Sequence, residues 1–210
     1  MDLSAISSEL HTELDAKLVA RERGLSSGRL AVRACGNAIR ALHRYEVDTA
    51  ERFLDEAQDG VDDARAALEG HPDMLYAGFV HDAEKELAEA RITFALVTGA
   101  PFPSPGSLGV PPAAFLKGMA EAIGELRRHI LDLMRRGDLE RCEELLDAVD
   151  DMYYVLVSMD YPDGITFGLR RLTDVARSII ERTRGDFTTS TVQNALRQAL
   201  EEHAANLEGR

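Results

Sequence analysis

Residues 79–97 read FVHDAEKELAEARITFALV, a segment in which apolar side chains recur every three or four positions. At about 100° per residue, this spacing predicts an α-helix with one apolar stripe. Glu86 falls on that stripe, among the side chains of Phe79, Ala83, Ala90, Phe94 and Val97. A carboxylate that faces a protein interior is costly unless it is paired or binds a metal. The segment therefore predicts a buried helix and an interior acid that needs a partner.

A second acidic pair lies on the next long helix that the pattern predicts. Glu89 follows Glu86 by three residues and Glu125 follows Glu121 by four, so each pair shares one side of its helix. Glu121 and Glu125 share their side with Gly118, whose small size would let another helix approach closely. If the two pairs face each other, their four carboxylates can hold a divalent cation. The alternative is that Glu121 and Glu125 belong to an ordinary solvated face.

The same periodicity runs through the whole chain and predicts an all-α fold. The chain has 210 residues, of which 45% are hydrophobic, and it has no Trp. Long stretches rich in Ala, Leu, Glu and Arg favour helices. This length and composition fit a single helical domain over residues 1–210.

Glycines, prolines and capping residues divide this domain into seven predicted helices. Asp48 and Glu51 resemble a capping box, Gly185 is expected to end the sixth helix, and Thr188 or Thr189 to cap the seventh. Five of the seven prolines fall in one long loop, residues 99–112, between the two acidic helices. The predicted helices span residues 2–45, 48–68, 73–98, 112–136, 138–159, 165–184 and 188–207.

The charge of the chain restricts its partners. A net charge of −13 and a pI near 4.9 argue against a protein that coats nucleic acid over its whole surface. A local site is compatible with that charge, because one side of the first predicted helix carries Arg29, Arg33, Arg40 and Arg44. Arginine recognises phosphate through two parallel hydrogen bonds. From the spacing alone, a solvated face paired with acids explains this stripe equally well.

The sequence predicts a soluble, cytoplasmic protein. No apolar run approaches the ~18 residues that a membrane span needs. The first residues lack the basic and apolar regions of a signal peptide. Cys35 and Cys142 have no metal-ligand spacing, and in a cytosolic protein both are expected to be reduced and buried.

Several motifs near the C-terminus are similar to those of a known family. They are YPDGIT at residues 161–166, GLRR at 168–171, TDVAR at 173–177 and IERTRGD at 180–186. Together with AIRALHR at residues 38–44, they resemble the prokaryotic, especially archaeal, members of the translin family. The likeness extends through most of the chain, and it implies the seven-helix translin-like bundle that periodicity also predicts.

The acidic stretches resemble the TRAX-like branch of this family. TRAX-type members carry E-x-x-E-A on the third helix and G-x-A-(D/E)-x-x-G-E-L on the fourth, and residues 86–90 and 118–126 match both patterns. At the fourth position of the second pattern, animal TRAX often has the shorter Asp where this chain has Glu121. The resemblance implies an endoribonuclease that depends on Mg²⁺ or Mn²⁺ and cuts single-stranded RNA.

The resemblance also implies a role for each of the four acids. Glu86, Glu89, Glu121 and Glu125 would form the catalytic site, with Glu89 and Glu125 as direct metal ligands. Glu86 and Glu121 would orient or deprotonate the attacking water. His129, one turn beyond Glu125, is the nearest candidate acid for the leaving oxygen.

Family members assemble as hollow octamers or similar closed oligomers whose sites face the interior. In such a chamber, Arg29, Arg33, Arg40 and Arg44 would guide RNA, and the arginine-rich sixth predicted helix would serve contacts between subunits. The resemblance leaves open whether a second, translin-type chain joins the assembly.

Three other functions compete with the nuclease. The first is a non-catalytic translin-like oligomer that binds single-stranded RNA or DNA. The second is a ferritin-like di-iron protein, but that fold requires Glu-x-x-His pairs on two helices, and the sequence has none. The third is a purely structural helical adaptor.

Overall fold

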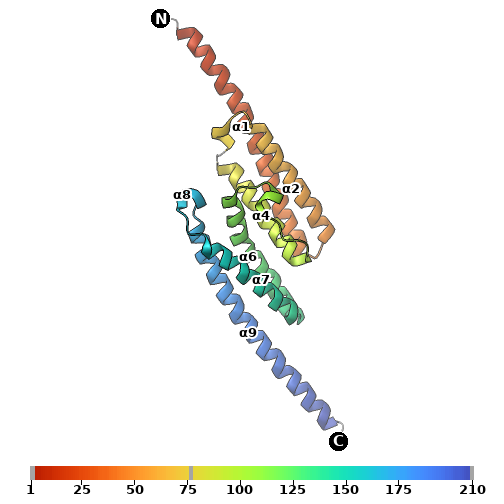
Figure 1. Ribbon diagram of the computed structural model, residues 1–210. Coiled ribbons are helices and arrows are strands. Elements are labelled where there is room, and N and C mark those ends of the chain that lie inside the picture. Colours follow the sequence, from red (N-terminus) through yellow and green to blue (C-terminus); the bar gives the residue numbers. More distant parts are fainter. Residues whose placement is uncertain (1–2, 76–77, 209–210) are drawn as a thin grey trace. The chain divides into compact units, whose positions relative to one another are not determined.

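The computed structural model describes residues 3–75 and 78–208, and within these ranges every regular element is a helix (Figure 1). The prediction of an all-α fold is confirmed. None of the described helices is both long and apolar enough to cross a membrane. The described elements are α1 (Leu3–His43), α2 (Val47–Leu68), α3 (Pro72–Leu75), α4 (Gly78–Thr98), α5 (Pro105–Leu108), α6 (Pro112–Arg136), α7 (Leu139–Ser158), α8 (Asp163–Thr166) and α9 (Leu169–Glu208).

The chain forms two compact units. The first ends at Gly118 and the second begins at Met119, so the division falls inside the continuous helix α6. The prediction of one domain over residues 1–210 stays a prediction.

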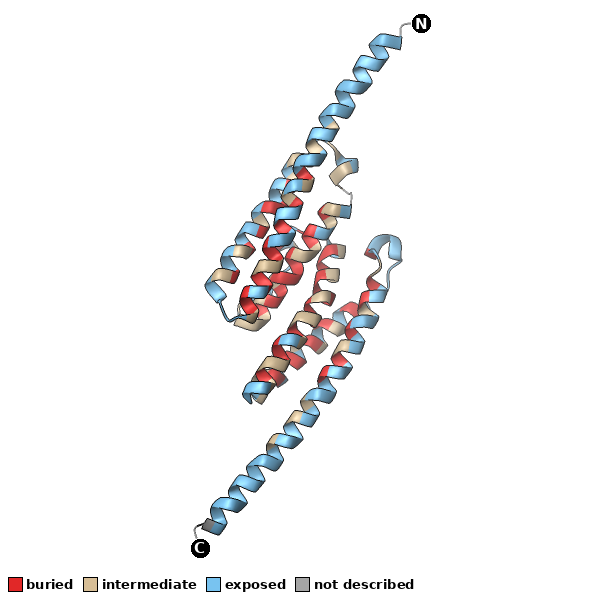
Figure 2. Cartoon of the chain, turned by 180° about the vertical axis from the view of Figure 1, so that it is seen from behind, coloured by how far each residue is buried: buried red, intermediate tan, exposed pale blue. Residues whose placement is uncertain are grey.

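In the first unit, α1, α2 and α4 lie side by side (Figure 1). The backbones of α1 and α2 approach closely at Gly60, where a Cβ atom would lie 3.1 Å from both the N and the Cβ of Ala31. Leu54, Leu87 and Ile92 are completely buried between these helices. The first half of α1 extends past its neighbours, and its side chains are exposed (Figure 2).

In the second unit, α7 packs against the first half of α9. Leu126 of α6, Leu145 of α7 and Ala176 of α9 are buried in this unit. Arg127 of α6 joins the helices by donating to Oγ1 of Thr183 at 2.9 Å. The second half of α9 is exposed along its length (Figure 2).

Two predicted helix starts have different outcomes. Helix α7 begins as predicted, because the carboxylate of Asp138 accepts a hydrogen bond from the backbone N–H of Arg141 at 3.2 Å. The predicted capping box at Asp48 is wrong, since α2 begins one residue earlier with Glu46 at its N-cap and without a side-chain cap. Asp48 instead lies in the first turn, where a negative charge interacts favourably with the helix dipole.

The predicted break at Gly185 is wrong. Helix α9 continues through it, and the predicted sixth and seventh helices form one element. The hydroxyls of Thr188 and Thr189 do not cap a new helix. They donate to the carbonyls of Arg184 and Gly185 one turn earlier, at 2.8 and 3.0 Å. A single glycine costs a helix only about 1 kcal/mol, which the hydrogen bonds of a continuous helix offset.

The predicted third helix and the proline-rich loop are also divided differently. The predicted helix over residues 73–98 appears as α3 and α4, and residues 76–77 between them lie outside the described residues. The loop after α4 contains the short helix α5. A capping box closes the start of α5, because Ser104 and Ser107 exchange hydrogen bonds at 2.9 and 3.0 Å.

Candidate metal centre

Helix α4 presents its acids at different depths. Glu84 and Glu89 are buried, with 5% and 8% of their surface exposed. Glu86 is half-buried and forms an ion pair with Lys85 at 2.9 Å. The interior acid of the predicted pair is therefore Glu89, and the placement of Glu86 on the buried stripe is wrong.

Helix α6 approaches the acidic segment of α4 at Gly118. A Cβ atom at this glycine would lie 2.6 Å from the carbonyl oxygen of Lys85 and 2.7 Å from the backbone nitrogen of Glu89. Real Cβ atoms do not come so close to backbone, so only glycine fits here. The prediction that a small residue permits close helix packing at this position is confirmed.

Glu121 follows Gly118 by three residues on the same helix, which places it about one turn further along α6. On α4, one carboxylate oxygen of Glu86 and one of Glu89 lie within 4.8 Å of each other. Glu125 is half-buried one turn beyond Glu121 on α6. The predicted role of Glu125 as a direct ligand stays a prediction.

The chemistry of this group fits a hard divalent cation. The carboxylates of Glu86 and Glu89 repel each other at this distance, and an opposite charge beside them relieves that repulsion. Carboxylate oxygens suit Mg²⁺ and Mn²⁺, whereas softer metals select thiolates and imidazoles. Burial, together with the charges of Glu86 and Glu89, raises the pKa of the nearby Cys35 thiol to about 12. Cys35 therefore stays a neutral thiol beside this group.

The two cysteines and His129 lie in the interior. Cys35 and Cys142 are both free and fully buried, which confirms the prediction that both are buried. His129 has 4% of its surface exposed. This burial limits the access of His129 to a leaving group, and its role as an acid stays a prediction.

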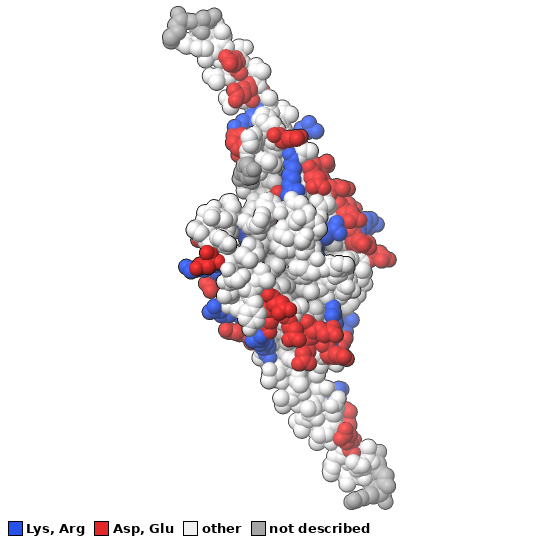
Figure 3. All heavy atoms as spheres, viewed as in Figure 1, with Lys and Arg blue, Asp and Glu red and all other residues white. Residues whose placement is uncertain are grey.

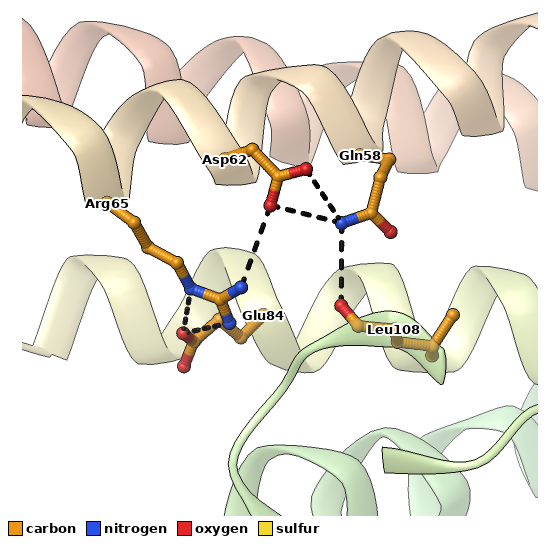
Figure 4. Close-up of polar contacts among 5 residues, drawn as sticks. All are labelled: Gln58, Asp62, Arg65, Glu84 and Leu108. Atoms are coloured by element: carbon orange, nitrogen blue, oxygen red, sulfur yellow. Dashed lines mark hydrogen bonds and ion pairs between the residues drawn. The ribbon is translucent and has the colours of Figure 1, made fainter. Parts of the chain in front are cut away.

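A polar network joins α2, α4 and the loop before α6 (Figure 4). Arg65 donates from Nε and Nη2 to one oxygen of Glu84, at 2.9 and 2.5 Å. Nη1 of Arg65 lies 3.7 Å from Asp62, whose carboxylate also accepts from Gln58 at 3.3 Å. Nε2 of Gln58 further donates to the carbonyl of Leu108 at 3.4 Å. Helix α2 is thereby connected both to α4 and to the loop.

Burial and pairing act on Glu84 in opposite directions. Burial raises the pKa of this carboxyl above its ordinary value, and the hydrogen bonds from Arg65 oppose that rise. This pair could not be predicted from the sequence, because its partners are nineteen residues apart on different helices. Helical periodicity assigns a face to each residue but does not pair the faces of two helices.

The arginine stripe of α1 is exposed, as expected for a nucleic-acid contact. Arg44 forms an ion pair with Glu46 at 2.8 Å, and Arg40 donates to the side chain of Asn37 at 2.6 Å. Arg29 and Arg33 form no ion pair with the residues that the structure describes. The predicted contact of this stripe with phosphates stays a prediction.

The wider surface carries mainly negative charge. On the face drawn in Figure 3, acidic side chains gather over α2 and over α7. A nucleic acid that approaches either helix would meet repulsion. The exposed stripe on α1 is therefore a local exception to an acidic surface.

Comparisons with known proteins give one clear group of relatives. No known family profile matches the sequence. An uncharacterised protein of Methanocaldococcus jannaschii is 28% identical over 183 residues, which are 86% of this chain and 80% of that protein.

Two solved structures, AfC3PO alone and AfC3PO in complex with duplex RNA, are 34% identical to the chain with a TM-score of 0.80. Each match covers 92% of this chain and 98% of the other. Apo-NeC3PO is 18% identical over 90% of this chain and 97% of its own, with a TM-score of 0.73, and shares the fold.

Proposed function

Because this chain belongs to the translin family, with AfC3PO as a 34% identical relative, we propose that it is a metal-dependent endoribonuclease. The observation that carries this proposal is the acid pair of α4. Carboxylate oxygens of Glu86 and Glu89 lie within 4.8 Å of each other, and the backbone at Glu89 meets Gly118, one helical turn before Glu121 on α6. The TRAX-like motifs at residues 86–90 and 118–126 contain these three acids and Glu125.

In the proposed hydrolysis, the acidic residues have two different roles, metal binding and proton transfer. Glu89 and Glu121 would hold a Mg²⁺ or Mn²⁺ ion, with Glu125 as a further ligand one turn along α6. The ion, when bound, neutralises negative charge that develops on the phosphoryl oxygens. Glu86 is more exposed than Glu89, and it accepts the proton of the attacking water. The water oxygen forms a bond to phosphorus, the phosphodiester P–O bond breaks, and the leaving oxygen takes a proton from solvent.

RNA is the substrate class that the relatives favour. AfC3PO has been solved with duplex RNA, whereas the sequence motifs led us to expect a single-stranded substrate. The exposed Arg29 and Arg33 supply positive charge that other described side chains do not neutralise. Both single-stranded and duplex RNA therefore need to be compared as substrates.

We further propose that the protein works as a closed oligomer of identical chains. The free half of α1 exposes Leu3, Ile6, Leu10 and Leu14, each with about half or more of its surface accessible. The free half of α9 exposes Leu196 and Leu200 in the same way (Figure 2). Exposed apolar stripes of this kind mark contacts between proteins.

Cleavage of labelled RNA tests the proposal. Single-stranded and duplex RNA are incubated with the full-length protein in Mg²⁺, Mn²⁺ or EDTA, together with the variants Glu89→Gln and Glu121→Gln. Glu143→Gln is the matched control, because Glu143 is an exposed acid on α7. We expect cutting that requires metal, that both site variants lose and that the control keeps.

Two results would contradict the nuclease. Cutting that persists in EDTA would exclude a dependence on metal. RNA that is bound but not cut, by an assembled oligomer in every metal, would identify the protein as a non-catalytic binding module.

A further inference from the structure

Helix α2 holds α4 at two points that enclose its acid pair. The first point is Glu84, which accepts both hydrogen bonds from Arg65. The second point is Arg91, whose Nη2 donates to the carbonyl of Leu54 at 3.1 Å and to Asp55 at 2.9 Å. Glu86 and Glu89 lie between these two points in the sequence of α4.

The same helix also holds the loop that leads into α6. Gln58 donates to the carbonyl of Leu108 (Figure 4). A Cβ atom at Gly109 would lie 3.3 Å from Nη1 of Arg65. Shortly afterwards α6 begins at Pro112, and its Gly118 contacts the backbone of α4 at Glu89. Arg65 therefore binds the helix that carries Glu86 and Glu89, and it lies close to the loop before the helix that carries Glu121.

These hydrogen-bonded contacts, at Glu84 and Arg91, are about two helical turns apart. Together they restrict both the rotation of α4 and its movement along its axis. The guanidinium group of Arg65 has a planar geometry, so the direction of Glu84 from α2 is restricted as well. Groups that bind a metal productively must be held within about 0.5 Å of their positions. A small rotation of α4 would move Glu86 and Glu89 by more than that.

A gain in stability does not by itself explain a buried pair of this kind. Replacing a buried ion pair with apolar side chains of similar volume is often neutral or stabilising. The side chains of Arg65 and Glu84 are 24% and 7% exposed, so most of the cost of removing their charges from water applies to this pair. The position of this ion pair, next to Glu86 and Glu89 on α4, explains its presence better than a gain in stability does.

We propose that Arg65 is a positioning residue, which sets the carboxylates of α4 for metal binding through Glu84. This inference rests on the proposed function, because it requires that the carboxylate group binds a divalent cation. Partners that orient metal ligands from outside typically change metal affinity by about 10- to 100-fold when they are lost. Since Arg65 acts through the helix and does not touch the ligands, we expect the lower end of that range.

Binding of Mn²⁺ to the full-length protein, followed by the electron paramagnetic resonance of the free ion, tests the proposal. The decisive variant is the double substitution Arg65→Met and Glu84→Met. It approximately keeps the volume of the pair, and it removes the hydrogen bonds that fix the direction of residue 84 from α2. We expect it to melt at an unchanged temperature and to bind Mn²⁺ about 10-fold more weakly. Arg52→Gln, an exposed arginine on the same helix, is the matched control and keeps the wild-type affinity.

Arg65→Lys is the second variant, because it retains a positive charge but not the planar fork. We expect it to fold and to bind Mn²⁺ more weakly than the wild type. Unchanged affinity in Arg65→Lys, or in the double variant, would overturn the positioning role while leaving the metal site intact. A wild-type protein that binds no Mn²⁺ would instead refute the proposed function, and the positioning role with it.

Discussion

Arg65 of α2 joins Glu84 of α4 through two hydrogen bonds to a single carboxylate oxygen, at 2.9 and 2.5 Å. Glu84 is buried, and burial raises its pKa while Arg65 lowers it. The hydrogen bonds from Arg65 therefore offset part of the cost of a buried charge on Glu84. This dependence couples the stability of the first unit to pH.

Arg65→Gln should lower the free energy of unfolding at neutral pH by about 2 kcal/mol. Breaking a buried pair costs roughly 3–5 kcal/mol, and the partial exposure of Arg65 reduces that cost. Without Arg65 the folded-state pKa of Glu84 rises further above its unfolded value, so folding is penalised where the unfolded carboxyl is ionised. The penalty disappears as the pH falls below the unfolded pKa.

Urea unfolding at pH 7.5 and pH 4.5 measures this effect. The deficit of Arg65→Gln relative to the wild type should shrink at the lower pH. Arg52→Gln, on the exposed side of α2, should show no deficit at either pH. A deficit of equal size at both pH values would mean that Glu84 is not the group left without a partner.

Gly118→Ala and Gly185→Ala should have opposite effects on stability. A Cβ atom at Gly118 would meet backbone atoms of Lys85 and Glu89 at 2.6 and 2.7 Å, so α6 must shift away from α4. We expect a loss of about 1–3 kcal/mol and weaker Mn²⁺ binding. Gly185 lies inside α9 with no atom near a Cβ position, and alanine there should add about 0.5–1 kcal/mol.

Urea unfolding of both alanine variants under the same conditions tests this pair of predictions. Each variant serves as the control for the other, since the same methyl group is added to a helix in both. A neutral Gly118→Ala variant with wild-type Mn²⁺ affinity would show that the close approach at Gly118 does not place the acids.

The helices that sequence predicts well are those whose ends have local causes. Residues 112–136 were predicted as a helix and form α6, because proline begins the helix and Gly137, with φ of 80°, ends it. Gly185 has no such role, since neither a cap nor a positive φ accompanies it. A breaker is therefore informative when a second local signal agrees with it.

The acids of the site could be found from motifs, but not the order of their burial. Periodicity placed Glu86 inside, whereas the neighbours that cover α4 bury Glu89. The Arg65–Glu84 pair could not be found at all, because it depends on how two helices pack. The close approach at Gly118 could be predicted from the sequence, because a small residue on the side of a helix that carries the acids lets another helix pack closely.

Both cysteines should resist modification in the folded protein. Burial raises the pKa of Cys35 to about 12 and that of Cys142 to about 11, so little thiolate exists at pH 8. Ellman's reagent at pH 8 should therefore react only slowly with the native protein. After unfolding in urea, both thiols should react rapidly. Rapid reaction of one thiol in native protein would contradict the burial of that residue.

The double substitution of Arg33 and Arg40 to Gln should weaken RNA binding and reduce its dependence on salt. Each lost phosphate contact lowers the slope of log K against log salt concentration by about 0.7–0.9, so two contacts lower it by roughly 1.4–1.8. Fluorescence anisotropy of labelled RNA at several salt concentrations measures the slope. These substitutions also make an already acidic protein more negative, which alone would weaken binding.

A matched control separates the two causes. Arg135 and Arg197 are exposed arginines of the second unit, and changing both to Gln gives the same net charge. If the α1 stripe contacts phosphates, only the Arg33 and Arg40 variant loses salt dependence by the amount of two contacts. Equal losses in both variants would assign the effect to net charge, and unchanged binding at low salt would exclude the stripe as the RNA contact.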